Sequence, residues 1–171
     1  MKIKAAIILA VFFAALNLLC VQQEEVYYGY VLEVVDGDTI KVNINGTVEK
    51  IRLLGIDCPE TRAANDPAKF QNISVEKLDY WGKVAKKFAE ENLNGKNVTI
   101  KIDPYSDRKD RYGRTLAYVY LEGVDFGALM IQKGLARVYT NAEFSKKAEY
   151  LKLQSEAMRS KVGVWSEMDE S

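Results

Sequence analysis

Apolar and polar residues alternate between positions 26 and 54, which is the spacing of half-buried β-strands. The alternation breaks at the Asp-Gly pair of positions 36 and 37 and again at the Asn-Gly pair of positions 45 and 46. Both dipeptides favour tight hairpin turns. The pattern therefore predicts a meander of three strands, the third of which runs from Thr47 to Leu54.

The apolar spacing becomes helical between Val75 and Leu93, where apolar residues recur every three or four positions. Asn94 and Gly95 then favour the end of the helix. We assign the aromatic residues of this stripe to the core, because the helical spacing already explains them. The preceding segment, 61–74, is polar and irregular, and Pro67 disfavours a helix there.

Capping signals predict two more helices in the C-terminal part. Asp125 is a favourable N-cap for a short helix that Gly134 ends. Thr140 and Glu143 have the spacing of a capping box, which would open a last helix that runs to about Ser160.

Two further apolar runs, 97–102 and 115–121, are predicted strands. The order of three strands, a helix, two strands and two helices predicts an α+β protein: a five-stranded OB-fold Greek-key β-barrel with three packed α-helices. A chain of 171 residues with 48% hydrophobic residues suits one domain. We expect that domain to span 26–166, with 163–165 folded back onto it and 167–171 as a tail.

The first twenty residues have the pattern of an export segment, because Lys2 and Lys4 precede an apolar run that is short for a membrane span. Residues 21–25 would be a short tether. Cys20 is either a lipid-attachment site after lipoprotein-type cleavage, or a residue removed with a signal peptide, or part of an uncleaved membrane anchor. In each case we expect the remaining chain to be exported, either secreted or anchored to the outer face of the cell membrane.

The net charge and the lack of histidine limit how the chain can bind nucleic acid and which catalytic groups it can use. The chain has 24 basic and 24 acidic residues, and loss of Lys2 and Lys4 with the leader would leave 22 against 24, so no global positive field attracts nucleic acid. Histidine is absent from the sequence, which excludes a histidine base, a Ser-His-Asp triad and the usual zinc ligands. Positive charge gathers locally before the last strand, at Arg108, Lys109, Arg111 and Arg114.

The most informative stretch is RLLGIDCPE, which runs from Arg52 to Glu60. Arg52 interrupts an apolar strand and must reach solvent, a carboxylate or an anionic ligand. A proline stiffens the bend that carries Asp57 and Glu60. Asp38 follows the first turn and would meet Asp57 at one end of the sheet, where the two carboxylates offer hard oxygen ligands to calcium. Taken alone, an Asp-x-Pro bend is also ordinary turn chemistry.

Two other stretches change this interpretation: VVDGDTIKV, from Val34 to Val42, and DRYGRTLAYVY, from Asp110 to Tyr120. In this order the three stretches resemble the staphylococcal nuclease (thermonuclease) family, and the resemblance extends from about Tyr30 to Trp165. It implies an exported calcium-dependent endonuclease that hydrolyses DNA and RNA with low sequence specificity and leaves 3′-phosphate ends. It implies DNA and RNA as substrates and no stable protein partner, and we expect a monomer.

The resemblance also implies roles for individual residues. Asp38, Asp57 and the backbone carbonyl of Cys58 would bind Ca²⁺, although the family has threonine where this chain has Cys58. Glu60 matches the general base, while Arg52 and Arg114 match the two arginines that grip the scissile phosphate. The substrate-binding residues would be Arg111, Tyr112 and Tyr139. The alternative is a non-catalytic OB-fold module that binds nucleic acid or protein, but such modules usually lose the acidic residues or arginines that this chain keeps.

Overall fold

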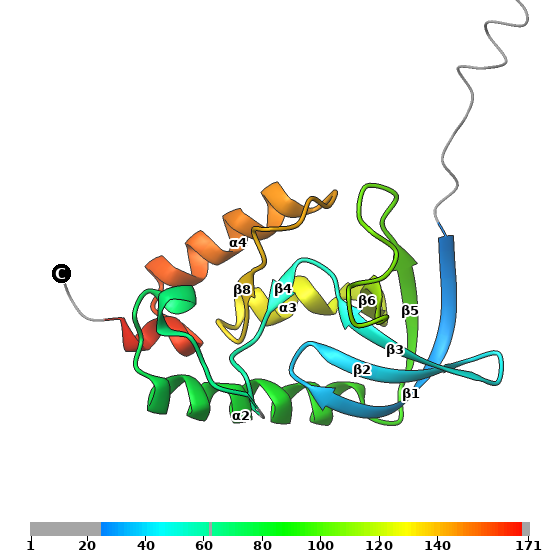
Figure 1. Cartoon of the computed structure of the whole chain (residues 1–171), viewed down its shortest axis with the longest axis horizontal. Helices are drawn as coiled ribbons and strands as arrows, with labels where there is room; N and C mark the ends of the chain where they lie inside the picture. The colour runs from blue at the N-terminus through cyan, green and yellow to red at the C-terminus, as the bar shows by residue number, and fades with distance from the viewer. Residues whose placement is uncertain (1–24, 62, 169–171) are drawn as a thin grey trace, which may run out of the picture.

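A computed structural model describes residues 25–61 and 63–168 (Figure 1). The barrel strands are β1 (Glu25–Asp36), β2 (Thr39–Ile44), β3 (Thr47–Leu53), β5 (Asn97–Ile102) and β6 (Thr115–Leu121). They follow one another in the order β3-β2-β1-β5-β6 as antiparallel neighbours, and a parallel pairing of β3 with β6 closes the barrel. The predicted α+β fold, an OB-fold Greek-key barrel, is confirmed.

Three short strands lie outside the barrel wall. β7 (Val124–Asp125) forms a hairpin with β6, while β4 (Ile56–Asp57) pairs with β8 (Arg137–Val138) in a separate two-stranded ladder. A strand of two residues is too short to have a periodic pattern, and none of these three strands was predicted from the sequence. The β4–β8 ladder matters for the site, because it brings residues some eighty positions apart into register.

The described helices are α2 (Val75–Leu93), α3 (Phe126–Gln132) and α4 (Lys147–Arg159), with 3-10 turns η1 (Pro67–Phe70) and η2 (Gly163–Glu167). In Figure 1, α2 runs along the bottom of the view beneath the barrel strands, and α4 lies at the upper left, with α3 between the two helices. Among the described residues, no helix is long and apolar enough to cross a membrane.

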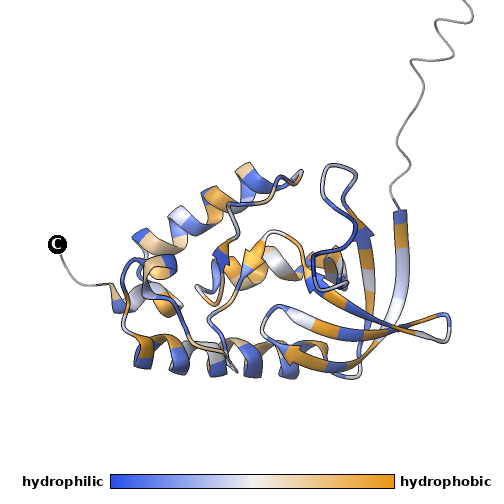
Figure 2. Ribbon diagram, viewed as in Figure 1, coloured by the Kyte–Doolittle hydropathy of each residue, from blue (hydrophilic) through white to orange (hydrophobic). Residues whose placement is uncertain are grey.

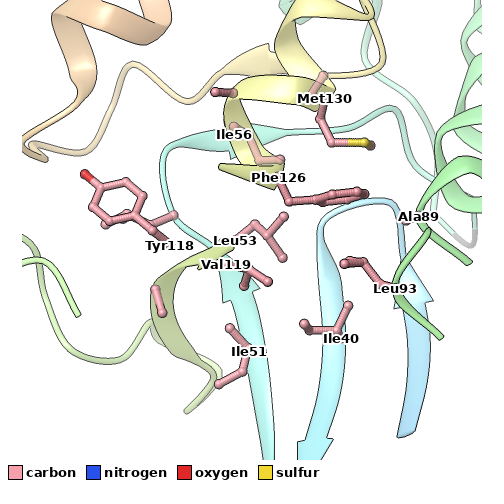
Figure 3. Packing of buried hydrophobic residues seen from close by; sticks show 14 of the residues in the cluster. Ile40, Ile51, Leu53, Ile56, Ala89, Leu93, Tyr118, Val119, Phe126 and Met130 are labelled. Atoms are coloured by element: carbon pink, nitrogen blue, oxygen red, sulfur yellow. The ribbon is translucent and has the colours of Figure 1, made fainter. Parts of the chain in front are cut away.

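The barrel interior is built from the alternating strand pattern, which Figure 2 shows as bands of apolar and polar residues along the strands. Ile40, Ile51, Leu53 and Val119 point inward from the strands, where Phe126 and Met130 of α3 and Leu93 of α2 meet them (Figure 3). A second, smaller cluster joins α2 to the C-terminus and contains Phe70, Leu78 and Trp165. Trp81 and Phe88, the aromatic residues of the α2 stripe, are partly buried against these clusters, and Val164 and Trp165 are buried, so 163–165 folds back as expected.

Three predicted details differ from the structure. The first turn consists of Gly37 and Asp38, one residue later than predicted, because Asp36 still pairs with Thr39. Pro67 begins η1 instead of preventing it, since a proline is tolerated at the first position of a helix, and the Asp66 side chain caps the turn by accepting a hydrogen bond from the Ala68 N–H.

The last helix begins at Lys147, and the predicted capping box of Thr140 and Glu143 does not form. The preceding segment is held by one long-range contact and one local ion pair instead. Phe144 is buried against Gly55, and the Glu143 carboxylate pairs with the Lys147 amine at 2.6 Å. The short helix after Asp125 is confirmed with its cap, because the Asp125 carboxylate accepts from the Ala128 N–H at 3.1 Å. The predicted export segment, with Cys20, lies outside the described residues.

Candidate active site

A cavity of about 720 Å³ opens where β3, β4 and the loop before β6 approach one another. Seven of the predicted site residues line it, and they come from three separate parts of the chain: Arg52, Asp57, Glu60, Arg111, Tyr112, Arg114 and Tyr139. Asp38 and Cys58 do not line the cavity, and both are buried. The fold thus gathers most of the predicted site residues around one cavity.

Arg52 links the two predicted calcium ligands. Its guanidinium forms an ion pair with Asp38 through one terminal nitrogen, and the other nitrogen donates to Asp57 at 3.1 Å. Burial lowers the pKa of Arg52, while the nearby Asp57 charge opposes that shift. The predicted meeting of Asp38 and Asp57 at one end of the sheet is therefore seen, with an arginine between them.

Cys58 contributes its backbone to the site and its side chain to the core. The Cys58 N–H donates to the Asp38 carboxylate at 2.8 Å. The thiol is free and buried, and a β-carbon on Gly37 would come within 2.9 Å of its sulfur, so the two segments touch. Burial raises the pKa of this thiol and keeps it protonated. Of the groups of Cys58, only the backbone carbonyl is therefore a suitable ligand for a metal that prefers oxygen.

The chemistry of these donors fits a hard divalent cation. Two carboxylates converge on the position that the Arg52 guanidinium now takes, and calcium prefers carboxylate, carbonyl and water oxygens. Within residues 25–61 and 63–168, however, no three acidic, cysteine or histidine side chains gather closely enough to form a metal centre. A bound cation would therefore rely on Asp38, Asp57, backbone oxygen and water, and Arg52 would have to withdraw from it.

Glu60 is held by a buried asparagine that the sequence reasoning did not identify. The Asn65 amide accepts from the Glu60 N–H at 2.8 Å, donates to the Glu60 carbonyl at 3.1 Å, and donates to Asp79 of α2 at 2.8 Å. The backbone at Glu60 also lies directly on α2, because a β-carbon at Gly82 would sit 2.6 Å from the Glu60 carbonyl oxygen. The position of Glu60 is thus fixed from both sides of its backbone.

The environment of the Glu60 side chain favours its neutral form. Partial burial, and then the negative charges of Asp36 and Asp57, raise the pKa of Glu60 above its ordinary value, while Arg52 lowers it less. A carboxylate with a raised pKa is a stronger base once it is ionised, which suits a group that removes a proton from water.

Arg114 reaches the cavity from the loop before β6, oriented by Asp110. Its Nε donates to the Asp110 carboxylate at 2.6 Å, and its backbone N–H donates to the same group at 3.0 Å. Tyr112 contacts two arginines, because the Arg111 and Arg114 guanidinium carbons are 4.7 and 5.4 Å from its ring centroid. Arg111 also donates to the Tyr112 hydroxyl at 2.6 Å.

The predicted positive patch is only partly present, which corrects the sequence interpretation. Arg111 and Arg114 line the cavity, but Arg108 and Lys109 line a different hollow, formed by the barrel strands. There Arg108 pairs with Glu25 at 2.5 Å and Lys109 with Glu49 at 3.9 Å. A bridge between Lys109 and Thr115 turns this part of the loop toward the barrel, so its charge does not add to the site.

Arg137 is a second residue that the sequence reasoning missed. It faces Asp57 across the β4–β8 ladder and donates to one carboxylate oxygen from both Nε, at 3.0 Å, and Nη2, at 2.7 Å. Its guanidinium also lies 5.6 Å from the Phe70 ring centroid. A signal was present in the sequence, because Arg137 interrupts the apolar run LARV just as Arg52 interrupts its own strand.

Comparison with known proteins agrees with the geometry. A family model described as staphylococcal nuclease homologue matches residues 50–167. An uncharacterized protein of Methanocaldococcus jannaschii is 40% identical over 156 residues, which cover 85% of this chain and 75% of the relative. The thermonuclease of Staphylococcus hyicus is 34% identical over 139 residues, which cover 80% of this chain and 74% of that protein. SPbeta prophage-derived endonuclease YokF of Bacillus subtilis is 37% identical, covering 77% of this chain but 42% of that protein.

Proposed function

We propose that this chain, which belongs to the staphylococcal nuclease family, is a calcium-dependent endonuclease that hydrolyses DNA and RNA with low sequence specificity and leaves 3′-phosphate ends. Relatives named thermonuclease and endonuclease support nuclease activity in general. The observation that carries the proposal is the convergence of Arg52, Glu60 and Arg114 on one cavity, beside two carboxylates suited to a cation. Calcium, the substrates and the product ends belong to the proposal.

The residues suit hydrolysis of a phosphodiester. Arg52 and Arg114 present planar guanidinium groups, each able to donate to two phosphate oxygens and so to stabilise the charge that develops on them. Asp110 orients Arg114 through its Nε, which leaves its terminal nitrogens for the substrate apart from a long contact of 3.4 Å with Thr39. Glu60, fixed by Asn65, would take a proton from the attacking water.

The metal would be held by Asp38, Asp57 and the carbonyl of Cys58. A bound calcium ion supplies positive charge to a phosphate oxygen and helps to orient water. The chain's own contribution is to keep Asp38 in place through the Cys58 N–H and Asp57 in place through Arg137. Release of Arg52 from both carboxylates would then free its guanidinium for the phosphate.

We further propose that the protein acts outside the cytoplasm, on the basis of the apolar N-terminal segment and the lysines before it. Expression of the full chain followed by fractionation tests this. Activity in the medium or on the outer membrane face supports export, whereas activity confined to the cytoplasm contradicts it.

The proposed function is tested with residues 21–171 incubated with plasmid DNA and with RNA. We expect both to be degraded in calcium, much more slowly in magnesium and not in chelator, because two carboxylates and a carbonyl suit a large, flexible coordination shell. Glu60→Gln and Arg114→Lys should lose most of the activity while keeping the fold. Binding without cleavage by the wild type in calcium would instead indicate a non-catalytic OB-fold module.

A further inference from the structure

Exposed tyrosines are not spread evenly over the molecule. Six tyrosines of the described residues are exposed, and three of them line the active-site cavity: Tyr105, Tyr112 and Tyr139. Tyr112 and Tyr139 were predicted substrate contacts. Tyr105 was not, although at 73% exposure it is the most exposed of the three.

The backbone at Tyr105 is firmly anchored. Its N–H donates to the Asp103 carboxylate at 2.8 Å, and Asp103 is itself buried. The same carboxylate accepts from the Tyr118 hydroxyl at 2.5 Å and from the Ser145 N–H at 2.6 Å. Asp103 therefore ties the Tyr105 loop both to the barrel and to the segment before α4, which lies beside it in Figure 1.

The ring of Tyr105 is exposed and does not contribute to packing within the described residues. Within the part of the chain that the structure describes, its ring and hydroxyl contact no partner by hydrogen bond, ion pair or aromatic packing. An aromatic ring held by a rigid backbone at the edge of a cavity is well placed for a planar ligand, because little freedom is lost on binding. By contrast, the Tyr112 ring already has two cation–π partners, the guanidinium groups of Arg111 and Arg114.

We propose that Tyr105 forms an additional binding subsite, in which its ring stacks on an unpaired base one or more nucleotides away from the scissile phosphate. Stacking on aromatic side chains is how proteins hold single-stranded nucleic acid without reading its sequence. Two features favour a base over another ligand. The cavity that Tyr105 borders also contains Arg52 and Arg114, which suit phosphates, and the Tyr105 ring itself carries no charge. The inference rests on the proposed nuclease function, and it adds a subsite that lengthens the substrate.

The experiment compares Tyr105→Ala and Tyr105→Phe with Tyr28→Ala, which removes an equally exposed tyrosine, 74%, from β1, away from the cavity. Cleavage of single-stranded oligonucleotides of two and eight nucleotides is measured in calcium. For Tyr105→Ala we expect KM on the longer substrate to rise about tenfold with kcat unchanged. KM on the dinucleotide should stay at the wild-type value. Tyr105→Phe and Tyr28→Ala should match the wild type on both.

Fluorescence anisotropy in a Glu60→Gln background measures binding of the same oligonucleotides without cleavage. The ratio of Kd between each Tyr variant and its parent should match the ratio of KM on the same substrate. If the wild type cleaves both substrates and Tyr105→Ala has an unchanged KM, the subsite is wrong and the nuclease function stands. An equal loss on both lengths would show a structural effect and would also overturn the subsite. If the wild type neither binds nor cleaves oligonucleotides, the proposed function fails, and the subsite fails with it.

Discussion

Replacement of Arg137 by methionine is expected to destabilise the protein, because Asp57 would lose its strongest partner. Arg137 places two N–H groups on one Asp57 oxygen, and both side chains are only 14% exposed. A hydrogen bond to a charged group contributes about 1.5–3 kcal/mol, and breaking a buried ion pair costs about 3–5 kcal/mol. Asp57 keeps Arg52, which reduces the cost. We therefore expect the free energy of unfolding to fall by about 3 kcal/mol, a large part of a typical total of about 5–15 kcal/mol.

Urea unfolding without metal, followed by tryptophan fluorescence, measures this loss. Arg159→Met is the matched control, since Arg159 is exposed in the last turn of α4 and should cost less than about 1 kcal/mol. Arg137→Lys should fall between the two, because lysine keeps the charge but not the planar pair of donors. A double-mutant cycle with Asp57→Asn should give a coupling above about 1 kcal/mol. Equal stability of Arg137→Met and the control would refute the reasoning.

Three further predictions concern groups that support the site. Asn65→Ala should lower the unfolding free energy by about 1–3 kcal/mol and lower kcat more than it changes KM, because both backbone groups of Glu60 lose their partner; an unchanged kcat would contradict this. Burial opposes ionisation of Asp103, but hydrogen bonds from Tyr118 and two backbone N–H groups outweigh it and lower its pKa. Its stabilisation is therefore complete above pH about 4 and lost as the pH falls further. In urea titrations at several pH values, Asp103→Asn should have a lower free energy of unfolding than the wild type at pH 7. It should also lose less of that free energy on acidification. If both proteins lose the same amount on acidification, Asp103 is not the source of the loss. Cys58→Thr should keep calcium affinity, measured by calorimetry, but lose about 1–2 kcal/mol of stability, because a hydroxyl replaces a buried thiol; a large loss of affinity would assign the sulfur a role.

The barrel could be predicted from the sequence because its signals are local and repeated. The helix from Val75 to Leu93 and the strands at 97–102 and 115–121 have the predicted bounds, since a clear periodicity and a turn signal limit each of them. The last helix exists and ends where it was predicted to end, but its predicted start was wrong, for the opposite reason. A capping box is a local signal, and burial of Phe144 together with the bond from Ser145 to Asp103 holds the chain in another conformation.

The sequence allowed the motif residues to be placed near one another, but it did not reveal the residues that hold them in position. Arg137 meets Asp57 only because two residues of β4 pair with two residues of β8, and no pattern of that length is visible in a sequence. Asn65 lies in a polar segment where one asparagine looks like any other. The positive patch failed because charge was counted along the chain, whereas Arg108 and Lys109 are turned toward the barrel by the bridge to Thr115.

The two arginines on Asp57 would have different roles in the cation binding that we propose. Arg52 lines the cavity, and its release would open to the metal one oxygen of Asp57 and one of Asp38, the latter still bonded to the Cys58 N–H. Arg137 does not line the cavity, and a strand pairing and the Phe70 ring keep it in place. Because Arg137 binds the other oxygen of Asp57, we expect the carboxylate to keep its orientation if the proposed cation replaces Arg52. In the proposed mechanism Arg137 would therefore be the fixed partner, and Arg52 would be the arginine that moves to the phosphate.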